Sequence, residues 1–231
     1  MSALARRTLG LALLVGARAL TAQIGHNPTR TPYADVTARQ TVTVFSGHFR
    51  ALRDPGGVAP QSAPLAGVRY DLRLGGPAHL TGRLQTIFSE RNVIDPTRPA
   101  ATRRIGTQSA TMTAADLGLT LALTGPKSYR RLVPTLGIGV GVISNFAGAD
   151  TAGYSFGTKF AFTGGFGMRY VSRSRWSAHG ELTGLMYALS YPPSFFEASS
   201  DGTPVVNSSI GRNAWRLNRT LTLGVTYDLF R

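Results

Sequence analysis

Apolar residues alternate with small or polar ones along much of this sequence, and this period constrains the fold more than any other feature. Between 135 and 142, Leu136, Ile138 and Val140 alternate with glycines. A period of two is that of a β-strand, whose successive side chains point to opposite faces. Equally clear segments are 116–123, 159–170 and 221–231, and weaker ones are 40–52, 65–74, 79–91 and 176–191. The sequence therefore predicts eight strands.

The first of these segments changes its alternation part-way along. Its apolar residues stand at even positions in Val42 and Val44, but at odd positions in Phe45 and Phe49. A β-bulge would produce such a change, because it inserts one extra residue into one strand of a pair. We therefore expect a bulge within 40–52.

The connections between the segments alternate between long and short. The turns GGPA, GPKSYRR and SRSR follow the second, fourth and sixth segments, whereas the other connections span 53–64, 92–108, 144–155 and 192–211. Successive connections of an up-and-down barrel lie at opposite ends. We therefore predict an all-β, antiparallel up-and-down barrel with the long loops at one end and the tight turns at the other. Its first and last strands then both end on the tight-turn side.

The two faces of the strands distinguish a membrane barrel from a soluble one. A soluble barrel needs a charged exterior, whereas a membrane barrel turns its apolar face to lipid. Only 16% of the residues are charged, and the non-apolar face consists mostly of Gly, Thr, Ser and Ala. Such a face suits the narrow interior of an eight-stranded barrel. The sequence thus favours an eight-stranded transmembrane β-barrel, with a soluble secreted ligand-binding barrel as an alternative.

Aromatic residues near the predicted strand ends also favour the membrane. Tyr and Trp are enriched at membrane interfaces because their apolar rings carry a polar group at one end. These residues are Tyr70, Tyr170, Trp176, Tyr191, Trp215 and Tyr227.

The first 22 residues have the layout of a secretory signal peptide. Two arginines precede an apolar run, small residues follow, and cleavage is expected after Ala19 or Ala22. The apolar run is too short for a spanning helix, which needs about 20 apolar residues. We expect 1–22 to be a signal peptide, 23–39 a flexible lead-in and 40–231 the barrel.

Composition limits the chemistry and the partners. The chain contains no cysteine, which excludes disulfides and thiolate zinc sites. Its formal net charge of +14 suits anionic partners such as lipid phosphates. A secreted destination argues against nucleic acid as a partner. No metal site or cofactor is predicted.

The C-terminal segment LTLGVTYDLFR carries a further signal. In hydrocarbon every backbone group must be paired, so a barrel must join its last strand to its first. The segment resembles the C-terminal assembly signal of small bacterial outer-membrane β-barrel proteins, and Arg231 after the aromatic departs from that pattern. The matching residues are Thr222, Gly224, Tyr227, Leu229 and Phe230. The resemblance implies a location in the outer membrane of a Gram-negative cell envelope and recognition by the barrel-assembly machinery.

The predicted inner face carries charges of both signs. They are Arg69, Asp71, Arg73, Arg83, Asp116, Lys159, Arg169, His179, Glu181 and Asp228. Unpaired charges are very costly in a cramped interior, so we expect them to form a network of ion pairs. Such a network could be a permanent plug, or a gate whose pairs rearrange to let small solutes or ions pass.

Two long loops carry candidate contact residues, because function concentrates in loops. Arg98, Arg103 and Arg104 would contact lipopolysaccharide phosphates or simply be solvated. Phe195 and Phe196 form an apolar tip that would cap the barrel mouth or bind a hydrophobic partner.

Catalysis has little support in the sequence. Lipid-modifying barrels need Ser, His and a carboxylate near the membrane rim. Of His26, His48, His79 and His179, only His179 has a carboxylate, Glu181, and a serine, Ser177, at strand spacing. Their shared face is luminal, away from lipid. We therefore predict a non-enzymatic outer-membrane barrel with a structural, surface-interaction or narrow-pore role, with a lipid acyl hydrolase or acyltransferase as the alternative.

Overall fold

The computed structural model describes residues 31–230. The predicted signal peptide, the start of the predicted lead-in, and Arg231 lie outside this range. No helix within it is long and apolar enough to cross a membrane.

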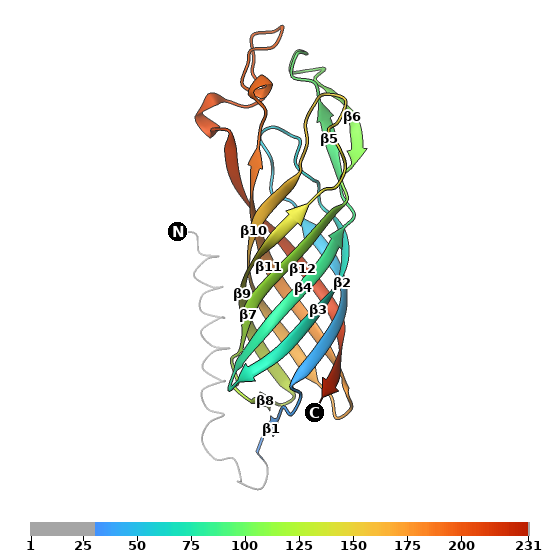
Figure 1. Ribbon diagram of the computed structural model, residues 1–231, viewed down its shortest axis with the longest axis vertical. Coiled ribbons are helices and arrows are strands. Elements are labelled where there is room, and N and C mark those ends of the chain that lie inside the picture. Colours follow the sequence, from blue (N-terminus) through green and yellow to red (C-terminus); the bar gives the residue numbers. More distant parts are fainter. Residues whose placement is uncertain (1–30, 231) are drawn as a thin grey trace, which may run out of the picture.

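Eight long antiparallel strands form a closed barrel (Figure 1). They are β2 (Gln40–Arg50), β3 (Ala63–Gly75), β4 (Ala78–Ile87), β7 (Met112–Ala122), β9 (Leu132–Ser144), β10 (Thr158–Val171), β11 (Trp176–Ser190) and β12 (Asn213–Phe230). Each pairs with the next along the chain, and β12 pairs with β2 to close the ring. Closure leaves no strand edge with unpaired backbone groups. The predicted eight-stranded up-and-down barrel is confirmed.

The connections also alternate as predicted, with tight turns at one end and long loops at the other (Figure 1). By the usual topology of membrane barrels, we call the long-loop end extracellular and the tight-turn end periplasmic. The second long loop contains a hairpin of β5 (Glu90–Ile94) and β6 (Arg104–Ser109). The last loop contains two 3-10 turns, η3 (Pro193–Phe195) and η4 (Ser208–Ile210).

Part of the predicted lead-in is structured beneath the barrel. Strand β1 (Tyr33–Asp35) pairs with β8 (Lys127–Tyr129) of the turn between β7 and β9. The Val36 amide donates to the Pro126 carbonyl at 2.9 Å, and the Ala38 side chain is buried. The sequence predicts no regular structure in this segment, because a strand of three residues is too short to show a period.

The alternation of the strands sorts their side chains between lipid and interior. Ile138, Leu223 and Val44 expose 71%, 69% and 63% of their surface on the outer face. Their sequence neighbours on the same strands point inward. Because the exposed apolar residues encircle the barrel, only a bilayer matches this surface.

The expected bulge in β2 is absent, so this prediction is wrong. From Thr41 to Phe49, where the alternation changes, β2 pairs with both β3 and β12 without a register shift. The irregularity at the start of β2, between Thr41 and Gln40, comes from the extra residue Leu229 on β12. The alternation changes because both faces are apolar at this point. Val44 faces outward, whereas Phe45 and Phe49 are buried inside the barrel.

The predicted aromatic residues divide into two groups. Tyr70, Tyr170, Trp176 and Trp215 are exposed on the outer face, and the Trp176 and Tyr227 ring centroids lie 4.8 Å apart. Tyr191 is only 4% exposed and packs among the extracellular loops, so its assignment to an interface girdle is wrong. Its position at a strand end does not distinguish the two environments.

Glycines on the inner face let neighbouring strands approach closely. A Cβ on Gly141 would lie 2.1 Å from the Ala115 carbonyl oxygen and 2.6 Å from the Asp116 Cα.

We expect Gly141→Val to abolish most barrel assembly, because backbone atoms must move to admit the side chain. Heat-modifiable mobility in electrophoresis measures the folded fraction. The control is Gly164→Val, where a Cβ meets nothing closer than 3.9 Å. Equal folding of both variants would contradict this account.

Candidate functional site

The barrel interior contains three successive layers. A small cavity lies at the periplasmic end, a band of paired charges lies above it, and an apolar plug fills the extracellular end. Each layer is built from inward residues of several strands, so closure of the barrel brings together side chains far apart in sequence.

Glu181 of β11 is the centre of the charged band. One of its carboxylate oxygens accepts from Arg69 of β3 at 2.5 Å, and the other accepts from Arg83 of β4 at 2.9 Å. Arg69 also pairs with Asp71 at 2.8 Å. All four side chains are largely buried, so these pairs are shielded from solvent screening.

Threonines satisfy many of the remaining polar atoms of the band. Thr81 donates to Asp71 at 2.7 Å, and Arg69 donates to Thr120 at 3.1 Å. Thr183 donates to Glu181 at 2.9 Å. The fifth charge, Asp116 of β7, is held more loosely, with its nearest oxygen 3.8 Å from Arg83 Nε.

A second, separate ion pair lies near the periplasmic end. Arg169 of β10 pairs with Asp228 of β12 at 2.5 Å and donates from Nε to Ser177 Oγ at 3.0 Å. Arg73 makes no ion pair within residues 31–230 and instead donates to the Val36 carbonyl at 2.9 Å. Arg73 therefore ties the structured part of the lead-in to the barrel wall.

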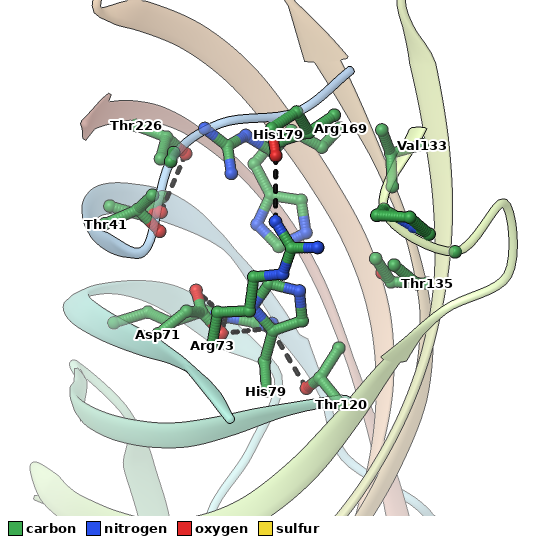
Figure 2. Close-up of a pocket in the computed structure, with 17 residues that line it drawn as sticks. Thr41, Asp71, Arg73, His79, Thr120, Val133, Thr135, Arg169, His179 and Thr226 are labelled. Carbon is green, nitrogen blue, oxygen red and sulfur yellow. Dashed lines mark hydrogen bonds and ion pairs between the residues drawn. The ribbon is translucent and has the colours of Figure 1, made fainter. Parts of the chain in front are cut away.

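Figure 2 shows Arg73, His79 and His179 pointing into the periplasmic cavity, which has a volume of about 50 Å³. A space of this size holds a few water molecules. Within the described residues, no cluster of three or more His, Asp and Glu side chains is arranged to hold a metal ion.

Lys159 is a predicted inner charge that joins neither ion-paired group. Its ammonium lies 5.2 Å from the Phe156 ring centroid, within cation–π range. Lys159 thus belongs to the apolar layer, because β10 carries it above the charged band.

The apolar plug is the feature that the sequence reading missed. Phe49, Ile87, Met112, Ile143 and Tyr187 are all fully buried inside the barrel and pack with loop residues. One signal was present in the sequence. In 185–189 the inward residues are bulky and apolar, whereas the inward residues lower in the barrel are small or charged.

Buried polar contacts anchor the extracellular loops to the plug. Arg91 pairs with Asp150 at 2.6 Å, with side chains only 2% and 1% exposed, and its guanidinium lies 4.9 Å from the Tyr154 ring centroid. Asp54 accepts from the Val58 and Ala59 amides at 2.8 Å each. The Tyr191 hydroxyl also donates to Asp54.

The predicted loop contacts have different environments. Arg104 is exposed, and Arg98 is exposed but paired with Asp95 at 3.0 Å. Arg103 donates to the Pro204 carbonyl at 3.1 Å, which joins the β5–β6 hairpin to the last loop.

Phe195 is fully buried and Phe196 half-buried, so the predicted apolar tip caps the mouth and Phe195 is not a surface contact. The Phe195 ring packs against the rings of Tyr154 and Tyr191, and these contacts hold Phe195 in the barrel mouth.

The predicted His, Ser and carboxylate set does not form a catalytic arrangement. Ser177 is engaged by Arg169, and Glu181 is engaged by two arginines. No hydrogen bond joins His179 to Ser177 in the described part of the chain. The three side chains lie inside the barrel, away from the lipid face.

Comparison with known proteins gives the same fold. No family model and no curated protein sequence matches the chain. Among solved structures, the outer membrane protein OprG from Pseudomonas aeruginosa matches with a TM-score of 0.52 and 11% identity, over 86% of this chain and 98% of that one. The N-terminal β-barrel domain of OprF from the same organism gives 0.46 and 12%, over 82% and 97%. A major outer membrane protein from Thermus thermophilus gives 0.44 and 12%, over 83% and 99%.

Removing the charge of Glu181 tests the charged band. In Glu181→Gln, Arg69 keeps its ion pair with Asp71, but Arg83 keeps a hydrogen bond to Thr183 and only a distant carboxylate, that of Asp116. We expect a loss of about 3–5 kcal/mol in unfolding free energy, the usual cost of breaking a buried pair. Urea unfolding in lipid vesicles measures it. Asp95→Asn breaks the exposed pair with Arg98 and should cost at most about 1 kcal/mol. Similar losses in the two variants would argue against a shielded band.

Asp201 makes the junction between two extracellular loops sensitive to pH. Hydrogen bonds from Ser199 and Thr203 hold the pKa of its carboxyl below the usual value, and its other oxygen accepts from the Ala100 amide at 2.7 Å. Because the pKa is lowered in the folded state, the ionised carboxylate stabilises the junction at pH values above about 3.9, the ordinary aspartate pKa. This stabilisation is lost progressively as the pH falls below that value. We expect Ala100 to lose exchange protection several-fold between pH 6 and 3. Asp201→Asn should lack protection already at pH 6, and pH-independent protection in the native chain would refute the link.

Proposed function

We propose that this chain, which has the fold of the small eight-stranded outer-membrane β-barrels, is a non-enzymatic outer-membrane protein with a structural and surface-interaction role. The observation that carries the proposal is the filling of its interior. A barrel of this size has just enough room for its own side chains. The loops add an apolar plug above the charges, so two layers of different chemistry oppose the passage of solutes.

The charged band supports a closed interior over an open pore. Glu181 joins Arg69 and Arg83 from the opposite side of the barrel. Opening this band would separate buried charges that have few other partners. The looser contact of Asp116 with Arg83, at 3.8 Å, is the one observation in favour of a narrow gated pore as a second candidate.

The extracellular loops support a role in surface interaction. Contacts between the β5–β6 hairpin and the last loop, such as the one from Ala100 to Asp201, hold the two together. Figure 1 shows these segments standing above the barrel. Because their bases are fixed by the plug, they form a pre-organised platform, which binds a partner with less loss of conformational entropy than free loops would.

The last strand supports recognition by the barrel-assembly machinery during insertion. Strand β12 forms the closing seam with β2, where Thr43 and Thr226 share a hydrogen bond of 2.7 Å. A Cβ on Gly224 would lie 2.6 Å from the Val44 carbonyl oxygen. The glycine of the proposed signal is therefore also a residue that the seam requires sterically.

Conductance in planar lipid bilayers tests the closed interior. We expect the folded chain to give no stepwise currents, because the plug and the charged band both block the lumen. Arg83→Gln should also be silent, since the apolar plug remains. A general porin in the same bilayers is the positive control. Currents in the native chain would exclude a closed barrel, and currents in Arg83→Gln alone would support the gated pore.

A further inference from the structure

Two arginines lie side by side on the outer wall of the barrel. Arg219 of β12 is the register partner of Arg50, the last residue of β2. Both side chains are exposed, and they share the outward face with Leu217 and Leu221. Directly opposed residues in antiparallel strands have Cβ atoms about 4.5–5.5 Å apart. The two guanidinium groups can therefore reach one ligand together.

The described part of the chain, residues 31–230, places no counter-charge on this pair. Within residues 31–230, no hydrogen bond or ion pair is made by either side chain. The nearest acid along the chain, Asp54, is engaged by loop amides and by Tyr191. Like charges directly opposite in a sheet are destabilising. An anion bound between the two guanidinium groups would replace this repulsion by attraction of both groups to the anion.

The wall below Arg50 is polar where lipid-facing residues are normally apolar. His48 and Ser46 are the next outward residues of β2, and both are exposed. They lie between Leu221 and Leu223 on one side and Pro64 and Ala66 on the other. We call His48, Arg50 and Arg219 the cationic patch. Polar groups facing hydrocarbon are costly unless they find a partner.

A polar groove lies immediately above the patch. The chain following Arg50 lines one side of it, and the groove has a volume of about 440 Å³. Arg53, Gln61 and Asn92 are among its lining residues. The Leu52 amide donates to the Asn218 side chain at 2.9 Å, which fixes the groove beside β12 and the patch.

An apolar strip, which we call the glycine strip, runs from the patch towards the bilayer interior. The Leu217 side chain lies over its first glycine, with Cδ1 3.0 Å from the position that a Gly184 Cβ would take, and the surface beside Gly164 is open. Gly184 of β11 is the register partner of Arg219, and Gly164 of β10 is that of Gly184. Gly164 is nearer to the periplasmic end of β10 than Arg219 is to the periplasmic end of β12. The row of Arg219, Gly184 and Gly164 therefore descends along the wall towards the periplasmic end. Phe162 and Phe166 project on either side of Gly164.

We propose that the cationic patch binds the phosphate of a phosphorylated glycolipid in the outer leaflet. The polar groove would take its sugar headgroup, and an acyl chain would lie over the glycine strip. Paired arginines suit phosphate because each guanidinium offers two parallel donors to its oxygens. The order of groove, cation pair and apolar strip is the order of sugar, phosphate and acyl chain in such a lipid. This inference rests on the proposed location in the outer membrane, but not on whether the lumen is closed.

Binding of bisphosphorylated lipid A to the folded full chain in detergent tests the site, with native mass spectrometry as the readout. We expect Arg50→Gln with Arg219→Gln to weaken binding at least about tenfold, since two charge-assisted contacts are lost. The matched control is Arg173→Gln with Arg175→Gln, which removes the same charge from a periplasmic turn and should bind as the native chain does. Equal weakening in both double variants would refute a specific site.

Two further arms separate the phosphate from the lipid. Dephosphorylated lipid A should bind as weakly to the native chain as lipid A binds to the Arg50 and Arg219 double variant. Millimolar inorganic phosphate should not displace lipid A, and displacement would mean that the patch is a free-anion site. Gly164→Val fills the strip and should weaken lipid A binding several-fold, and unchanged binding would refute the acyl contact.

A last outcome concerns a second copy of this chain as the occupant. If the native chain forms dimers that the Arg50 and Arg219 double variant lacks, while lipid A binding is unchanged, the patch is a subunit contact and the proposal fails. Heat-modifiable mobility of every variant shows that the barrel is folded. Failure of the lipid site is therefore distinguishable from failure of the membrane-barrel assignment.

Discussion

The pairing of every backbone group inside a hydrocarbon phase is the constraint on which the rest of this structure depends. A sheet in lipid can meet it only by closing, and β12 meets it by pairing with β2 over most of its periplasmic part. Closure with eight strands fixes the diameter of the barrel. The diameter in turn leaves an interior that side chains alone can fill. The apolar exterior and the crowded interior are thus two consequences of the same requirement.

The crowded interior explains where the charges are placed. Arg69 and Arg83 come from neighbouring strands, whereas Glu181 comes from across the barrel. One carboxylate can serve two guanidinium groups because the lumen is narrow enough for both to reach it. Above this level the interior is apolar, because the loops fold back and pack Phe195 and Tyr154 in one cluster with strand residues such as Tyr187. The charges are therefore closed off on the extracellular side by packing rather than by more charge.

The sequence was most informative where the signal is local. The alternation located the eight strands, and the lengths of the connections oriented them. Prediction from the sequence failed where one pattern of residues is compatible with two environments. The change at Phe45 suggested a bulge, but the residue simply faces an apolar part of the interior. Tyr191 and Phe195 looked like surface aromatics, yet the fold places both in the plug. The inner charges could be named from parity, but their partners could not.

The sequence by itself determined the strand period, the number of barrel strands, the order of long and short connections, and which face of each barrel strand meets lipid. These properties follow from neighbouring residues, since adjacent side chains on a strand must point to opposite faces. Only the tertiary structure decided that Arg69 and Arg83 share Glu181, that Arg73 instead ties down the chain at Val36, and that Arg50 meets Arg219 on the outer wall. These contacts depend on the register between strands and on the curvature of the closed sheet, because both bring together residues that the sequence keeps far apart.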